Sequence, residues 1–199
     1  MNPLTAVPSH PSTDRGARTL LRRWPAALGV ALGLSQLLTD DPRSVTGALL
    51  VLLLATTGYV LIAALDRPRW SWAVIGSLVV LLTGTRLASA PPVVELGAVV
   101  LLILAAVTVG VARGTWKKGG LHRWQPLAAL GFLALCLAAL AVSTETGRLI
   151  IGVGLIAHTV WDCLHWRRHA VVSASLAEWC AALDLTLGVG VLVVTIGSW

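Results

Sequence analysis

The chain has 199 residues, of which 56% are hydrophobic and only 12% are charged, whereas a soluble domain carries roughly 25% charged residues. Apolar runs of about 20 residues recur from end to end, so the composition excludes an ordinary soluble domain and predicts an all-α, multi-pass membrane protein. The formal net charge of +6 does not indicate a nucleic-acid partner, because the basic residues lie in short segments between apolar runs, where they orient helices.

The first 20 residues are polar and rich in proline, serine and arginine, so we expect residues 1–20 to form a disordered cytoplasmic tail. Residues 21–199 are expected to fold as a single transmembrane helical domain. Its first, short helix carries Gly29 and Gly33, a pair of small residues that permits close helix packing. In all, the apolar runs predict seven helices, at about 21–38, 44–65, 69–88, 92–113, 124–143, 147–167 and 172–197.

The loops predict the orientation of these helices. With the N-terminus inside, only three of the 15 basic residues fall on the outer side: Arg43, Arg86 and Arg148. Because basic residues concentrate in cytoplasmic segments, this asymmetry predicts seven spans with the N-terminus inside and the C-terminus outside, in the plasma or inner membrane of the cell. Arg86 and Glu95 flank Pro91-Pro92, and we expect them to form an ion pair at the outer surface.

A cluster of ionisable residues interrupts the last two apolar runs. His158, Asp162 and His165 are offset by 0, 4 and 7 positions, which places them within about 60° of one another on a helix. Glu178 and Asp184 follow in the next helix. At about 1.5 Å per residue, Glu178 reaches the depth of Asp162, and Asp184 lies about one turn beyond His158. Ionisable groups inside a bilayer are costly, so they mark a functional site by default.

One interpretation of the cluster is a metal site. Helical bundles build such sites from a carboxylate and a histidine three residues apart, completed by a carboxylate from a facing helix. Asp162, His165 and Glu178 are therefore the predicted ligands, and a divalent ion such as zinc or iron suits them. His158 would support these ligands or form a second site with Asp184. Structural hydrogen bonds around Asp162, or a proton or ion relay, are the alternatives.

Asp184 is the deepest acid in the chain, and no lysine or arginine is predicted at its depth. An ionised carboxylate there would cost several kcal/mol unless it were paired. We therefore expect Asp184 to be neutral, bound to a metal or hydrogen-bonded to hydroxyls. The candidate hydroxyls belong to Thr56, Thr57, Tyr59, Ser77 and Thr83.

The leading functional hypothesis is an integral membrane enzyme that acts on a hydrophobic small molecule. Asp184 and His158 are its predicted catalytic residues, either in metal-assisted hydrolysis or in acid-initiated isomerisation or cyclisation. A small proton-coupled transporter and a non-catalytic membrane subunit are the alternatives. Ser173 and Ser175 lie near the start of the last predicted helix, and we expect them to cap it rather than to catalyse.

Overall fold

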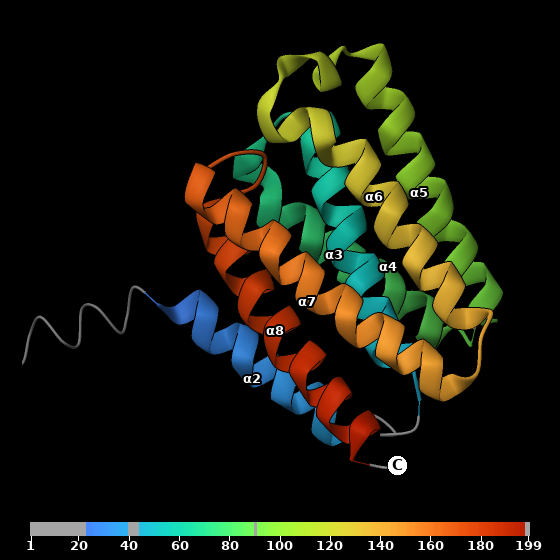
Figure 1. Ribbon diagram of the computed structural model, residues 1–199. Coiled ribbons are helices and arrows are strands. Elements are labelled where there is room, and N and C mark those ends of the chain that lie inside the picture. Colours follow the sequence, from blue (N-terminus) through green and yellow to red (C-terminus); the bar gives the residue numbers. More distant parts are fainter. Residues whose placement is uncertain (1–22, 40–43, 90, 198–199) are drawn as a thin grey trace, which may run out of the picture.

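The computed structural model describes residues 23–39, 44–89 and 91–197, and the predicted tail over residues 1–20 lies outside them (Figure 1). The described chain forms helices and contains no strand. The α-helices are α2 (Trp24–Thr39), α3 (Thr46–Leu65), α4 (Ser71–Leu87), α5 (Pro92–Ala112), α6 (Gly120–Leu140), α7 (Thr144–Arg168) and α8 (Ala174–Ile196). Two 3₁₀ turns, η1 (Pro68–Trp70) and η2 (Thr115–Lys118), lie in the connections.

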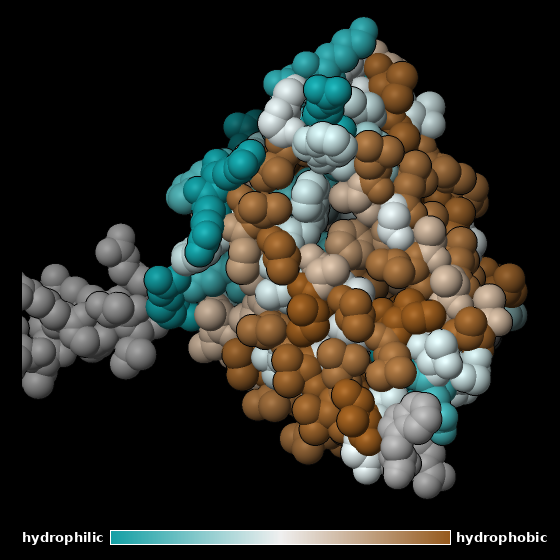
Figure 2. Space-filling view, viewed as in Figure 1, coloured by the Kyte–Doolittle hydropathy of each residue, from teal (hydrophilic) through white to brown (hydrophobic). Residues whose placement is uncertain are grey.

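The all-α bundle predicted from the sequence is confirmed. Six of the described helices, α3 to α8, are long and apolar enough to cross a membrane, and α2 is a shorter apolar helix of 16 residues. Figure 2 shows a surface that is largely hydrophobic. Among the exposed apolar side chains, Leu38, Val80 and Leu101 are exposed by 85%, 72% and 68%. Water does not favour contiguous apolar surface of this extent, so the bundle has the character of a multi-pass membrane protein. The count of seven spans and their orientation remain predictions.

Helix α3 lies at the centre of the bundle (Figure 1) and packs against α4, α5, α6, α7 and α8. Its sequence is apolar all round, which is typical of a helix that is enclosed on every side. Leu52, Val60 and Ile62 are fully buried. Tyr59, on the same helix, is buried as well, and it brings a polar group into the interior.

The first and last described helices pack closely, as the glycine pair predicted. A Cβ atom at Gly29 would lie 2.4 Å from the carbonyl oxygen of Trp179, and one at Gly33 would lie 2.9 Å from Cβ of Thr186. Because Gly29 faces Trp179 and Gly33 faces Thr186, α2 and α8 run in the same direction. Two parallel helices begin on the same side of the bundle, which agrees with an odd number of spans.

Charged residues mark the two ends of the bundle. The connections after α3, α5 and α7 lie at one end, where Figure 2 shows hydrophilic residues gathered, and we call this the basic end. Asp66 forms an ion pair there with Lys118, and Nε2 of His122 lies 3.5 Å from its other carboxylate oxygen. At the opposite end, Arg86 Nε lies 3.6 Å from a carboxylate oxygen of Glu95, so the predicted ion pair is confirmed.

Hydroxyl groups cap the two helices that carry the ionisable cluster. Ser143 Oγ accepts a hydrogen bond from the N–H of Thr146 at the start of α7, and Ser173 Oγ accepts one from the N–H of Leu176 at the start of α8. Ser175 Oγ accepts a hydrogen bond from the indole of Trp72 at 3.0 Å. The capping role predicted for Ser173 is therefore confirmed.

Candidate functional site

Three ionisable side chains meet in the interior of the bundle. His158 and Asp162 come from α7, and Asp184 comes from α8. The imidazole Nδ1 of His158 lies 2.9 Å from one carboxylate oxygen of Asp184 and 3.4 Å from one of Asp162. One ligand atom from each residue lies within 4.8 Å of the others, and each side chain is at most 1% exposed. We call this group the His–Asp–Asp cluster.

The local sequence explains why the cluster forms. His158 and Asp162 are one helical turn apart, so both point from the same face of α7. Glycines let α8 approach that helix closely, since a Cβ atom at Gly188 would lie 3.1 Å from the carbonyl oxygen of Gly152. Asp184 lies one turn before Gly188 and shares its face. The short side chain of Asp184 can therefore reach His158.

Aromatic rings enclose the cluster. The ring of Tyr59 on α3 meets the imidazole of His158 edge-on, with 5.4 Å between centroids, and that of His165 in the same way at 5.0 Å. Phe132 on α6 packs against His158 at 4.8 Å. The cluster is thus held between four helices and has apolar walls.

The cluster contains more acceptors than donors. Asp162 Oδ1, both carboxylate oxygens of Asp184 and the hydroxyl oxygen of Tyr59 are buried and make no hydrogen bond within the described chain. Although Asp184 lies 2.9 Å from His158 Nδ1, the direction of approach does not make a hydrogen bond. A buried polar group left without a partner costs about 1–3 kcal/mol. One imidazole nitrogen offers a single N–H and the Tyr59 hydroxyl a single O–H. These two donors are too few for the four carboxylate oxygens of Asp162 and Asp184, so a cation or additional protons would be needed to satisfy all of them.

His165 is buried one turn along α7 from Asp162, but both of its ring nitrogens are already engaged. Its Nδ1 lies 2.7 Å from the carbonyl oxygen of Trp161, and its Nε2 lies 2.5 Å from the side-chain nitrogen of Gln125. A carbonyl oxygen only accepts, so Nδ1 donates to it and Nε2 accepts from the amide. No lone pair of His165 is left for a metal ion.

Glu178 lies elsewhere. It forms an ion pair with Arg23, at 3.1 Å between Nη1 and Oε1, on the side of α8 that packs against α2. The structure therefore brings together His158, Asp162 and Asp184. The ligands predicted from the sequence were Asp162, His165 and Glu178, and of these only Asp162 belongs to the cluster. Depth along a helix says nothing of direction around it, and Glu178 and Asp184 differ by roughly 120° in direction.

The Asp184 carboxylate lies against His158, and it makes no hydrogen bond to a hydroxyl of α3 or α4 in the part of the chain that the structure describes. A sequence signal for this pairing exists, although the apolar pattern alone does not reveal it. Cys180, Asp184 and Gly188 recur every four residues on α8. This stripe of small side chains favours a close helix contact, and it places Asp184 on the face that meets α7.

Comparison of the chain with protein-family models, with curated proteins and with solved structures finds no match in any of the three. The chemistry of the His–Asp–Asp cluster is therefore the basis on which a function is proposed.

Proposed function

We propose that His158, Asp162 and Asp184 bind one divalent metal ion, zinc or iron, and that the protein is an intramembrane metalloenzyme acting on a lipid-soluble substrate. The observation that carries this proposal is the convergence of three buried ligand residues whose carboxylate oxygens outnumber the available donors. Imidazole and carboxylate ligands suit either metal.

The separations within the cluster support a shared ion. Zinc binds nitrogen and oxygen at about 2.0–2.2 Å, so two ligands at a tetrahedral angle lie about 3.4 Å apart. The imidazole nitrogen of His158 lies 2.9 and 3.4 Å from the two carboxylates. Three protein ligands also match the catalytic type of zinc site, which keeps one position for water or substrate.

Charge balance supports the same proposal. Two ionised carboxylates and a neutral imidazole carry two negative charges, which a divalent ion neutralises. A neutral centre avoids most of the free-energy cost of placing charge inside a membrane. When bound, the ion would supply a Lewis acid and an activated water molecule. The apolar walls from Tyr59 and Phe132 favour a hydrophobic substrate.

The test is the metal content of the purified full-length protein, measured by elemental analysis. We expect about one zinc or iron ion per chain. His158→Gln should lower this content at least about tenfold, because the variant removes a ligand. His165→Gln is the matched control, since His165 is a buried histidine of the same helix whose ring nitrogens are already hydrogen-bonded. Absence of metal from the wild-type protein, or equal loss in both variants, would overturn the proposal.

A proton-coupled carrier is a second candidate, and one observation favours it. Polar side chains continue from the cluster toward the basic end, with the ring of Tyr59 against both imidazoles and Gln125 hydrogen-bonded to His165. Chains of this kind conduct protons in membrane pumps. A protein that binds no metal but carries protons into liposomes, with the flux lost in Asp184→Asn, would establish this function instead.

A further inference from the structure

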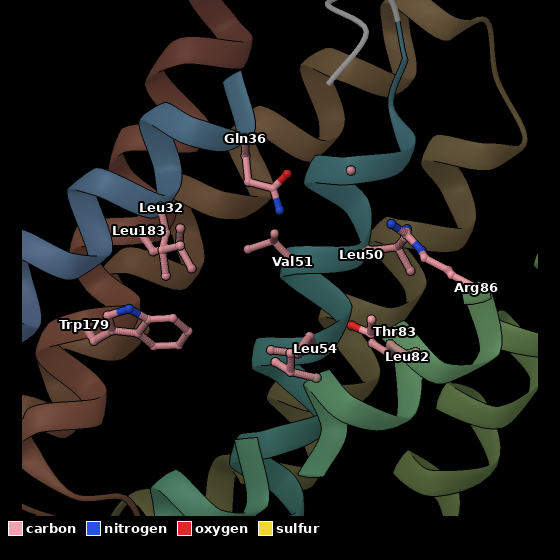
Figure 3. Close-up of a pocket in the computed structure, with 12 residues that line it drawn as sticks. Leu32, Gln36, Leu50, Val51, Leu54, Leu82, Thr83, Arg86, Trp179 and Leu183 are labelled. Carbon is pink, nitrogen blue, oxygen red and sulfur yellow. The ribbon is translucent and has the colours of Figure 1, made fainter. Parts of the chain in front are cut away.

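A cavity of about 280 Å³ lies between α2, α3, α4 and α8, outside the His–Asp–Asp cluster (Figure 3). Its deep wall is apolar, with Val51 and Leu54 from α3 and Trp179 and Leu183 from α8. We call it the lateral cavity. Trp179 and Leu183 are one turn apart on α8, and Asp184 points from a neighbouring face of that helix.

The mouth of the lateral cavity opens on the apolar side surface of the bundle. Leu32 on α2 and Val79 on α4 form its rim and are exposed by 41% and 44%, whereas Trp179 and Leu183 on its floor are exposed by only 7% and 6%. Helix α2 packs mainly on α8, and α4 packs mainly on α3. The cavity between these two helix pairs is therefore open at the side of the bundle, between α2 and α4. A molecule dissolved in the bilayer can therefore enter it.

Apart from the indole N–H of Trp179, which is buried and makes no hydrogen bond within the described chain, the polar groups of the lateral cavity lie at one end. Gln36, Thr83 and Arg86 lie in the last two turns of α2 and α4, at the end of the bundle opposite the basic end. Figure 3 shows the amide of Gln36 pointing into the space between α2 and α3. Arg86 is the only charged residue that lines the cavity in the described chain. Its Nε faces Glu95 at 3.6 Å, and a guanidinium has five N–H donors, so donors remain for another acceptor.

We propose that the lateral cavity binds a fatty acid, with one acyl chain against α3 and α8 and the carboxylate at Arg86, where Thr83 and Gln36 offer further donors. The volume of about 280 Å³ equals that of roughly nine water molecules. This is room for a single alkyl segment, and it is less than the roughly 400 Å³ that one turn of a helix occupies at a diameter of about 10 Å and a pitch of 5.4 Å. The guanidinium donors of Arg86 that do not face Glu95 complement a carboxylate. The proposal does not depend on the metal site.

The test uses a palmitic acid that carries a photoreactive diazirine in its tail, added to the purified full-length protein. We expect labelling of α3 and α8 that unlabelled palmitate displaces. Val79→Trp should fill the mouth and lower this displaceable labelling about tenfold or more, a loss expected when about 1.4 kcal/mol of binding is removed. Val80→Trp is the matched control, because Val80 is 72% exposed and does not line the cavity. Equal labelling of Val79→Trp and Val80→Trp would overturn the proposal.

A second measurement tests the head group. Arg86→Gln should weaken binding of the diazirine palmitic acid about tenfold, because a hydrogen bond between charged groups is lost. Binding of the corresponding diazirine alcohol should not change. Equal weakening for acid and alcohol, or no weakening for the acid, would overturn the assignment of Arg86. Metal content should stay at the wild-type level in Val79→Trp and Arg86→Gln, which keeps this result separate from the test of the metal centre.

Discussion

Replacing Gly29 with alanine is expected to loosen the contact between α2 and α8. The new Cβ would lie 2.4 Å from the carbonyl oxygen of Trp179 and 3.0 Å from both the amide nitrogen of Leu183 and Cβ of Ala182. Ordinary contact begins at 3.4 Å, so one helix must move by about 1 Å to restore normal packing. Helix α8 cannot yield easily, because it is packed against α7 at Gly188 on its other side.

Overpacking of this kind costs about 1–3 kcal/mol. The higher helix propensity of alanine returns roughly 0.5–1 kcal/mol. The net cost lies between about 0 and 2.5 kcal/mol, and we expect Gly29→Ala to lower the free energy of unfolding by about 1–2 kcal/mol, around the middle of that range. For a chain of this length, that corresponds to a fall in Tm of about 2–8 °C.

The assay is thermal unfolding of the purified protein in detergent, followed by circular dichroism. Gly76→Ala is the matched control, since a Cβ at Gly76 in α4 would meet no heavy atom of the described chain within 4 Å. Its Tm should equal or exceed that of the wild type, because only the gain in helix propensity remains. If Gly29→Ala and Gly76→Ala had the same Tm, the close approach of α2 to α8 would be refuted.

Three further outcomes are expected. A reporter enzyme that works only outside the cytoplasm, fused after Trp199, should be active, because the basic residues predict seven spans with the N-terminus inside; silence at normal expression would contradict that topology. Asp184→Asn should fold normally yet hold less than about a tenth of the wild-type metal. Asp184→Leu should lose the metal and also lower the Tm, because it removes the polar partner of buried His158. A fully metal-loaded Asp184→Asn variant would contradict this expectation. The hydrogen bond and charge of Lys118 lower the pKa of Asp66 below 3.8, so its contribution to stability should be complete above pH 3.8 and fade as the pH falls through the lowered value. Because the Asp66 side chain is 37% exposed, Asp66→Asn should cost well under about 1 kcal/mol at pH 7, and a Tm difference that did not shrink in acid would argue against the pairing.

Most of the fold follows from the sequence. Apolar runs set the helices, and the predicted boundaries differ from the observed ones by at most four residues, at the start of α6, where the helix begins at Gly120 rather than at residue 124. That helix continues beyond its apolar part, which a hydropathy pattern cannot show. The packing at Gly29 and Gly33 was also predictable, because small residues four apart allow close approach of two helices.

The central position of α3 was not predicted. Several helices of a membrane protein are apolar all round. Composition therefore does not show which helix is surrounded by other helices and which is surrounded by lipid. The apolar pattern also does not predict which face of α8 packs against the rest of the bundle. The apolar surface of this helix gives no preferred face, and the partner of Asp184 depends on the face that packs.

The cluster was therefore predicted only in part. The shared face of His158 and Asp162 follows from their spacing, and the structure places both beside Asp184. His165 lies on the same face but is hydrogen-bonded to Gln125, a neutral side chain that a pattern of ionisable residues does not include. Glu178 is paired with Arg23 near the basic end. Residue type and depth along a helix are therefore not enough to identify the ligands of a metal site. Neighbouring residues, here Gln125 and Arg23, can bind the same side chains.

The order of the helices along the chain has a consequence for biosynthesis. Helix α7 brings His158, Asp162 and His165 into the bilayer, and an aspartate at the centre of a helix alone raises the free energy of membrane insertion by about 2.5–3.5 kcal/mol. Helices α3 and α6 are made earlier, so Tyr59 and Gln125 are available when α7 is inserted. Asp184 arrives only with α8, the last of the described helices to be made. A ribosome stalled before α8 should therefore leave α7 weakly inserted and open to membrane quality control.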